Sequence, residues 1–250
     1  MEMFEVGGCV RDEILGLPSK DIDFSVVLSE GDIGKRGPFQ SMVDALKFKG
    51  FRIFLMSPQY LTVRAQFPKP QSLVAIKHER AGMTADFVLA RKESDYTDGR
   101  RPDKVEVGTL EDDLNRRDFT MNAIAKDAEG NFIDPHNGRH DIECKIIRAV
   151  GDPFDRLNED ALRAVRAMRF HVTKGFMIEP GLVFAMQSRA VLDAIENKIS
   201  DERIKDELSK MLHFSTMKSL HAFQRFPALT AAMFSGSVNL DATMKQKGFK

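Results

Sequence analysis

The stretch GGCVRDEILGLPSKDIDF, residues 7–24, joins a pair of glycines to a short helical run and then to a strand that opens with two aspartates. In an extended chain, residues two apart point to the same side, so Asp21 and Asp23 project together, away from the packed side. Two carboxylates this close repel each other unless a cation lies between them. The pair therefore predicts a divalent metal site, with a solvated strand end as the alternative.

The two glycines, Gly7 and Gly8, open the helical run, which is predicted to end at Gly16. Glycine lets the backbone approach a ligand closely, and a helix N-terminus favours phosphate groups. Arg11 adds a cation just inside the helix. A glycine pair alone predicts only a turn, but this one leads through a helix into the two aspartates and so indicates a triphosphate site beside the metal.

A third acid, Asp86, lies in the apolar run TADFVLAR, residues 84–91, which is typical of a strand. Its side chain is expected on the side opposite Phe87. If this strand neighbours the first, Asp86 completes an acidic trio that could hold two ions for an in-line displacement at phosphorus. A polar residue at the start of a strand is the simpler alternative.

The composition is that of an ordinary folded chain: 250 residues, 42% hydrophobic and 30% charged, with a net charge of zero. Its apolar stretches fall short of the roughly 20 residues that a membrane helix needs, and an acid stands where a signal peptide has basic residues. We therefore expect a cytoplasmic protein with no membrane partner. The two cysteines, Cys9 and Cys144, lack disulfide or metal spacing and are predicted to be buried.

Hydrophobic periodicity divides the chain near residues 135–145. Short β-branched or aromatic runs before this boundary predict strands and one helix, whereas apolar residues recur at helical spacing after it. The strands are predicted at 21–28, 50–56, 60–67, 72–78 and 84–91, and the helices at 38–50, 158–170, 180–195 and 200–212. The expected fold class is α/β followed by all-α.

The C-terminal residues 211–250 carry five basic side chains and one acid. Such a segment suits a nucleic acid partner, and a solvated terminus is the alternative. Residues 221–234 within it are apolar enough to pack as a short helical body.

Five motifs follow one another along the chain: VGGCVRD with DIDF, YTDGRRP, LEDDLNRRDFTMNAIA, GDPFDRLNEDALRAVRAMRF and SDERIKDELSKML. In this order they resemble the class II tRNA nucleotidyltransferases, that is, the CCA-adding enzymes and the related bacterial poly(A) polymerases. The resemblance implies a polymerase β-like nucleotidyltransferase head domain at 1–140, a helical neck at 141–212, and a short helical body with a basic tail at 213–250.

The resemblance also implies an activity, the template-independent addition of C and A to tRNA 3′ ends from CTP and ATP with release of pyrophosphate. Mg²⁺ would be the cofactor, held by Asp21 and Asp23, with Asp86 as a third catalytic acid. Gly7, Gly8 and Arg11 would line the phosphates. A poly(A) polymerase is the nearest alternative; a non-catalytic RNA-binding protein and a small-molecule transferase are alternatives of other classes.

The segment RRDFTMNA offers a fork of donors in Arg117, an acceptor in Asp118 and an amide in Asn122. These groups suit a ribose 2′-hydroxyl and phosphate oxygens. In the resembled family this motif favours ribonucleotides. An ordinary helix capped by Asp118 is the alternative.

The segment NEDALRAVRAMRF, residues 158–170, is expected to choose the base. On one helix Asp160 and Arg163 would be neighbours on one face, with Glu159 and Arg166 close by. An acceptor beside a fork of donors matches the amino group and ring nitrogen of cytosine or adenine and mismatches uracil and guanine. An ion pair on a solvated helix face is the alternative.

Two further segments carry residues of possible functional use. Residues 91–104 are polar and contain glycine and proline, which predicts a mobile loop between the strand of Asp86 and the next helix. In the resembled CCA-adding enzymes a loop here helps the pocket switch from CTP to ATP. The adjacent His140 and Asp141 resemble a metal phosphohydrolase pair only superficially, because further ligands at suitable spacing are lacking.

Overall fold

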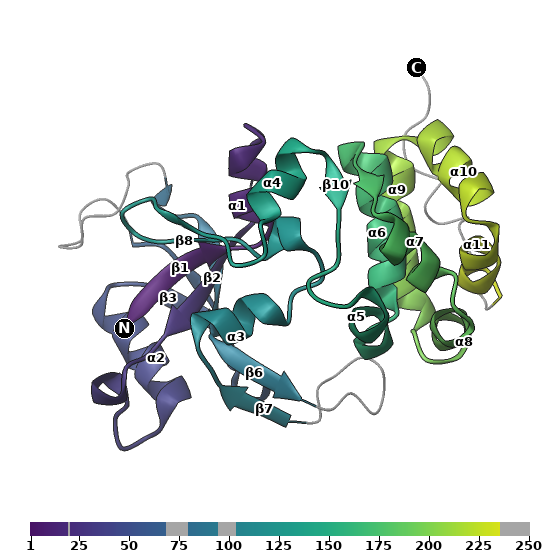
Figure 1. Ribbon diagram of the computed structural model, residues 1–250. Helices are drawn as coiled ribbons and strands as arrows, with labels where there is room; N and C mark the ends of the chain where they lie inside the picture. Colours follow the sequence, from purple (N-terminus) through teal and green to yellow (C-terminus); the bar gives the residue numbers. More distant parts are fainter. Residues whose placement is uncertain (20, 69–79, 95–103, 236–250) are drawn as a thin grey trace. The chain divides into compact units, whose positions relative to one another are not determined.

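The apolar alternation in the first half of the chain builds a seven-stranded sheet in the order β3-β4-β5-β2-β1-β8-β9. Strands β1, β2, β3 and β8 of this sheet are labelled in Figure 1. Strands β2 and β5 run parallel, and every other neighbouring pair in this sheet is antiparallel. The computed structural model describes residues 1–19, 21–68, 80–94 and 104–235. The strands are β1 Glu2–Val6, β2 Ile22–Val27, β3 Arg52–Ser57, β4 Thr62–Gln66, β5 Thr84–Leu89, β8 Ala125–Lys126 and β9 Phe132–Ile133.

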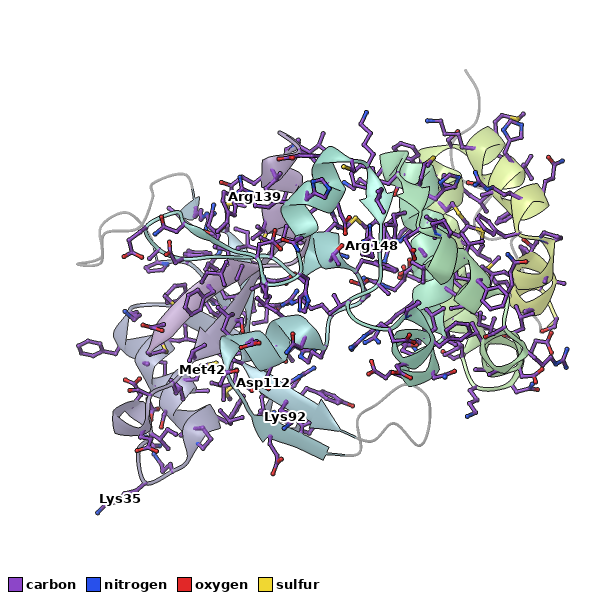
Figure 2. All side chains as sticks on the ribbon, viewed as in Figure 1. Lys35, Met42, Lys92, Asp112, Arg139 and Arg148 are labelled. Carbon is purple, nitrogen blue, oxygen red and sulfur yellow. The ribbon has the colours of Figure 1, made fainter. Side chains whose placement is uncertain are left out.

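One face of this sheet packs into an apolar core with helix α2, Pro38–Phe48. Met42 of α2, labelled in Figure 2, is fully buried there. Phe24 and Phe87 come from the neighbouring strands β2 and β5 and stack with their ring centroids 5.0 Å apart. Such aromatic pairs contribute about 1 kcal/mol beyond their buried area. The core therefore fixes which side chains of β2 and β5 are left on the opposite face.

The chain divides into two compact units, Met1–Ser94 with Lys104–Ile142, and the residues from Glu143 onward. The first unit also contains a hairpin of β6, Arg91–Ser94, and β7, Lys104–Val107. Its remaining elements are α1 Gly8–Ile14, η1 Glu30–Asp32, η2 Pro58–Tyr60, α3 Leu110–Asn115, η4 Thr120–Asn122 and α4 Gly138–Glu143.

The second unit is helical, as the periodicity predicts. It contains α5 Pro153–Glu159, α6 Leu162–Lys174, α7 Pro180–Met186, α8 Arg189–Asn197, α9 Asp201–Phe214, α10 Thr216–Arg225 and α11 Pro227–Met233, with a small parallel pair β10 Ile146–Ile147 and β11 Met177–Ile178. Helices α6 and α9 pack together, and each buries a stripe of apolar residues. Glycine 175, in the left-handed conformation, ends α6.

Two single helices predicted from the sequence are each interrupted in the structure. The helix at 158–170 is wrong because Asp160 is extended and separates α5 from α6, where its side chain accepts from the N–H of Leu162 at 3.1 Å. The helix at 180–195 is wrong because Ser188 is extended and precedes α8. Aspartate and serine both favour the N-cap position, where the backbone is extended. At these two positions this local preference outweighs the continuous apolar period that predicts a single helix.

The prediction of a loop at 91–104 is wrong at both of its ends, where β6 and β7 form the hairpin. Residues 95–103 lie outside the described residues, as do the predicted strand at 72–78 and residues 236–250. The burial of Cys9 is confirmed, but Cys144 is exposed in the turn after α4. Among the described residues no helix is long and apolar enough to cross a membrane.

Candidate active site

A row of charged side chains crosses the sheet on the face opposite the aromatic core. Asp23 of β2 lies in register with Asp86 of β5, and Asp86 lies in register with Arg64 of β4. Val63 and Ala65, on either side of Arg64, are buried in the core. Because side chains alternate along a strand, the three charged residues share the other face.

These side chains line a cavity of about 830 Å³. Asp21, two residues before Asp23, also lines it, so the pair expected from the sequence opens into the same space as Asp86. This volume is within the range of pockets that hold small ligands.

The surroundings of Asp23 disfavour the ionised form of its carboxylate. Burial raises the pKa of Asp23 above its ordinary value; the Arg117 guanidinium opposes this rise, and the neighbouring carboxylates Asp86 and Asp21 add to it. A cation between the carboxylates would remove this repulsion.

The donor set fits Mg²⁺ through two carboxylates. Mg²⁺ is commonly held by one or two carboxylates together with substrate phosphates. Asp21 and Asp23 can provide the two carboxylates. In the described part of the chain, no group of three or more His, Cys, Asp and Glu side chains could hold a metal ion. The carboxylate of Asp86 instead accepts from Nε and Nη2 of Arg64, at 2.7 and 2.6 Å.

Gly7, at the N-terminus of α1, stands directly against this site. It has a φ of +76°, which L side chains rarely adopt, and a Cβ there would lie 2.8 Å from Nη1 of Arg117 and 3.9 Å from Oδ2 of Asp23. Only glycine fits such a position without displacing a neighbour. Gly7, the Asp23 carboxylate and Arg117 are therefore brought together from three separate motifs.

Arg11, Asn122 and Asp118 form a buried chain of hydrogen bonds behind α1. Nη1 of Arg11 donates to Oδ1 of Asn122 at 2.6 Å, and Nδ2 of Asn122 donates to Oδ1 of Asp118 at 2.9 Å. Nε of Arg11 also donates to Asp12 at 2.9 Å. Charge-assisted bonds in a buried network fix geometry, so η4 is held rigidly against α1.

Arg117 is positioned by α3. Its Nη2 donates to Asp113 at 3.0 Å, and its Nε is buried without a hydrogen-bond partner among the residues that the structure describes. Burial alone would raise the pKa of Asp113, but the Arg116 and Arg117 guanidiniums outweigh it and hold that pKa below its ordinary value. Asp112, labelled in Figure 2, forms a capping box with Thr109 that starts this helix.

The residues expected to choose the base lie in the second unit, in an arrangement that differs from the expected helix face. Asp160 lies in the break between α5 and α6, and its carboxylate accepts from Nη1 and Nη2 of Arg203 at 3.3 and 2.7 Å. Arg163 is on α6 and donates to Glu159 at 2.5 Å. Asp160 and Arg163 thus each form an ion pair with a partner of opposite charge and not with each other.

Arg166 lies on the same helix as Arg163 and 3.5 Å from the carboxylate of Glu207 on α9. Glu207 is almost fully buried and also accepts from Arg169. Arg203 and Glu207 both belong to the motif SDERIKDELSKML, but their pairing with Asp160 and with the arginines of α6 was not predicted from the sequence. Their i,i+4 spacing, which places both on one face of α9, was the available signal.

Arg64 was also missed, although its signal was simple. In the run YLTVRAQF it is the one charged residue among apolar neighbours, and alternation places it on the polar face. The pairing of β2 with β5, which brings Asp23 beside Asp86, could not be read from the chain order, because β3 and β4 come between these two strands in the sequence. Asp141, by contrast, is buried and accepts from Thr120 at 2.7 Å, which gives the HD pair a structural role.

Known proteins similar to this chain match its first unit and also most of its second unit. The family model described as the poly A polymerase head domain matches residues 3–148. The CCA-adding enzymes of Limosilactobacillus fermentum and Geobacillus stearothermophilus are 39% and 37% identical over 212 residues, 84% of this chain and 46% and 45% of those proteins. The crystal structure of the Bacillus stearothermophilus CCA-adding enzyme in complex with CTP has a TM-score of 0.70 at 30% identity, covering 92% of this chain and 49% of that one. This chain spans about half the length of these relatives.

Proposed function

This chain belongs to the poly(A) polymerase head domain family, together with the CCA-adding enzymes, and from that premise we propose that it is an RNA nucleotidyltransferase that adds C and A to tRNA 3′ ends. CTP and ATP would be its substrates and pyrophosphate its second product. The observation that carries the proposal is the meeting of Gly7, the Asp23 carboxylate and the Arg117 guanidinium. Nucleotidyl transfer needs a phosphate-binding backbone beside a metal site, and these residues supply both.

Asp21 and Asp23 would hold the metal on the polar face of β2. Bound Mg²⁺ would supply positive charge to the triphosphate and to the attacking hydroxyl. Asp86 adds negative charge beside the pair, but its carboxylate is engaged by Arg64, so we assign the metal to Asp21 and Asp23.

The phosphates and the sugar would lie along α1 and η4. Gly7 and Gly8 would present backbone N–H groups to the phosphates, and Arg11 ties this helix to Asn122. Arg117, Asp118 and Asn122 would then bind the ribose, because their donors and acceptors match its hydroxyls.

The base would be chosen by Asp160 and Arg163 in the second unit. The carboxylate accepts from an amino group and the guanidinium donates to a ring nitrogen, a pattern that C and A share and that U and G oppose. Glu159 holds Arg163 at 2.5 Å, and Arg166 lies further along the same helix. This proposal gives the first unit the chemistry and the second unit the selection.

We further propose that the head domain is 1–140, the neck 141–212 and the helical body with its basic tail 213–250. The division of the described chain between Ile142 and Glu143 supports the first of these boundaries. A protein that matures tRNA would act in the cytoplasm.

Incubation of the protein with each nucleoside triphosphate in turn, on tRNA that lacks its 3′ end, tests the proposal. We expect incorporation of CTP on this RNA and of ATP once CC is present, with no incorporation of UTP or GTP. Absence of incorporation and of pyrophosphate release from every triphosphate would refute it and leave a non-catalytic RNA-binding protein.

The second candidate is a poly(A) polymerase, favoured by the description of the matching head domain. The same assay separates the two functions, because a poly(A) polymerase would build long A tails from ATP alone without first requiring C. The length of the ATP product is therefore the deciding readout.

A further inference from the structure

The direction from which the RNA primer must reach the proposed site follows from the order of the strands. Asp23 on β2 lies between β1, which leads into Gly7, and β5, whose far neighbour β4 carries Arg64. With the triphosphate on the Gly7 side, an in-line displacement requires the attacking hydroxyl to come from the other side of Asp23. The 3′ end of the primer would therefore lie over β5 and β4.

That side of the site is strongly acidic. Asp21, Asp23 and Asp86 line the cavity of about 830 Å³, and Arg64 is the one basic residue in its lining among the described residues. An RNA terminus brings phosphate charge into this space, where it meets three carboxylates. A cation is needed to offset this repulsion, in addition to the metal.

Arg64 is built to be that cation. Its guanidinium has five N–H donors in a fixed plane, and Asp86 takes two of them at 2.7 and 2.6 Å. The Arg64 side chain is 50% exposed and that of Asp86 27%. The bidentate pair therefore holds a partly exposed guanidinium in one orientation, with its remaining donors available to a ligand in the cavity.

We propose that Arg64 binds the last phosphodiester of the RNA primer and that Asp86 is its positioning residue. The inference rests on the proposed function, since it takes the triphosphate to lie at Gly7. The adjoining Arg80 does not serve this purpose, because it is paired with Glu5 at 2.7 Å through two hydrogen bonds.

Equilibrium binding of a tRNA ending in CC, measured without nucleoside triphosphate, gives the first test. We expect Arg64→Ala to weaken binding roughly tenfold, as for the loss of a charge-assisted hydrogen bond. Arg36→Ala is the matched control, because Arg36 also pairs with a carboxylate, Asp44 at 2.5 Å, but is 71% exposed and outside the cavity. It should bind as the parent does.

The second test changes the RNA instead of the protein. The parent protein should bind a primer whose last linkage is a neutral methylphosphonate roughly tenfold more weakly than the normal primer. Arg64→Ala should bind the two primers with equal affinity. If the methylphosphonate costs both proteins equally, or if Arg64→Ala binds the normal primer like the parent, the inference is wrong.

Arg64→Lys guards against a folding defect, since it keeps the charge but not the bidentate geometry. It should show an intermediate affinity with an unchanged melting temperature, and parent affinity would overturn the role of Asp86. Both binding tests run without turnover, so failure of the parent to incorporate any nucleotide would refute the proposed function while leaving the Arg64 result readable.

Discussion

The fold disfavours the charge of the Asp23 side chain. Burial raises its pKa, so the folded state binds the proton of Asp23 more tightly than the unfolded chain. Its favourable contribution is present below the unfolded pKa and is lost as pH rises through the folded pKa. The ionised carboxylate therefore lowers the stability of the folded state at neutral pH.

We expect Asp23→Asn to abolish incorporation and to unfold at a higher urea concentration than the parent at pH 7. The gain should shrink as the pH falls toward the ordinary pKa of an aspartate. Urea unfolding followed by circular dichroism at several pH values measures this. A variant that is less stable at pH 7, or that keeps near-parental activity, contradicts the assignment.

Gly7 should tolerate no side chain. An alanine there would combine a φ of +76° with a contact of 2.8 Å to Arg117, so we expect a loss of about 2 kcal/mol in the free energy of unfolding and a raised KM for CTP. Gly16 has a φ of +67°, and no atom of the described part of the chain lies within 4 Å of a Cβ built there. Gly16→Ala should therefore cost only about 1 kcal/mol and leave KM unchanged. Equal effects of the two variants on KM would remove the phosphate role of Gly7.

Helix α9 is expected to take part in base selection through Arg203, although it carries no residue proposed to touch the base. Arg203 holds the carboxylate of Asp160 in the break between α5 and α6. We expect Arg203→Gln to reduce the preference for CTP over UTP by roughly tenfold, about 1.4 kcal/mol, while incorporation continues.

Arg189→Gln is the control for that experiment. Arg189 forms an exposed i,i+4 pair with Asp193 on α8, and such pairs contribute little. Its nucleotide preference should match the parent. If Arg203→Gln lowers the rates with CTP and UTP equally, the helix supports the fold and not the choice of base.

The elements themselves were largely predictable from the sequence where one period dominates. The strands around Phe24 and Phe87 alternate clearly, and α9 follows the helical period, so both were predicted in place. The break at Asp160 was not, because one extended residue does not disturb the apolar period on either side of it. The partners of Asp86 and Asp160 were also missed, since Arg64 and Arg203 meet them only through tertiary packing.

Across the whole chain, the metal is expected to serve chemistry and not folding. The core of the first unit is apolar and aromatic, and the proposed metal ligands Asp21 and Asp23 line a cavity on the other face of the sheet. Treatment with EDTA should therefore stop incorporation, which Mg²⁺ should restore, and should leave the melting temperature unchanged or slightly changed. Unfolding on chelation would show a structural metal instead.

The two units together should determine the sequence of the nucleotides added to the RNA, because one unit is proposed to supply the transfer step and the other the choice between bases. The most direct measurement is to give the protein a tRNA that lacks its 3′ end, all four nucleoside triphosphates and Mg²⁺, and then to sequence the RNA 3′ ends. We expect products that end in CCA and go no further. Long A tails, a mixture of all four nucleotides or unextended RNA would contradict the proposal that this chain builds the CCA end.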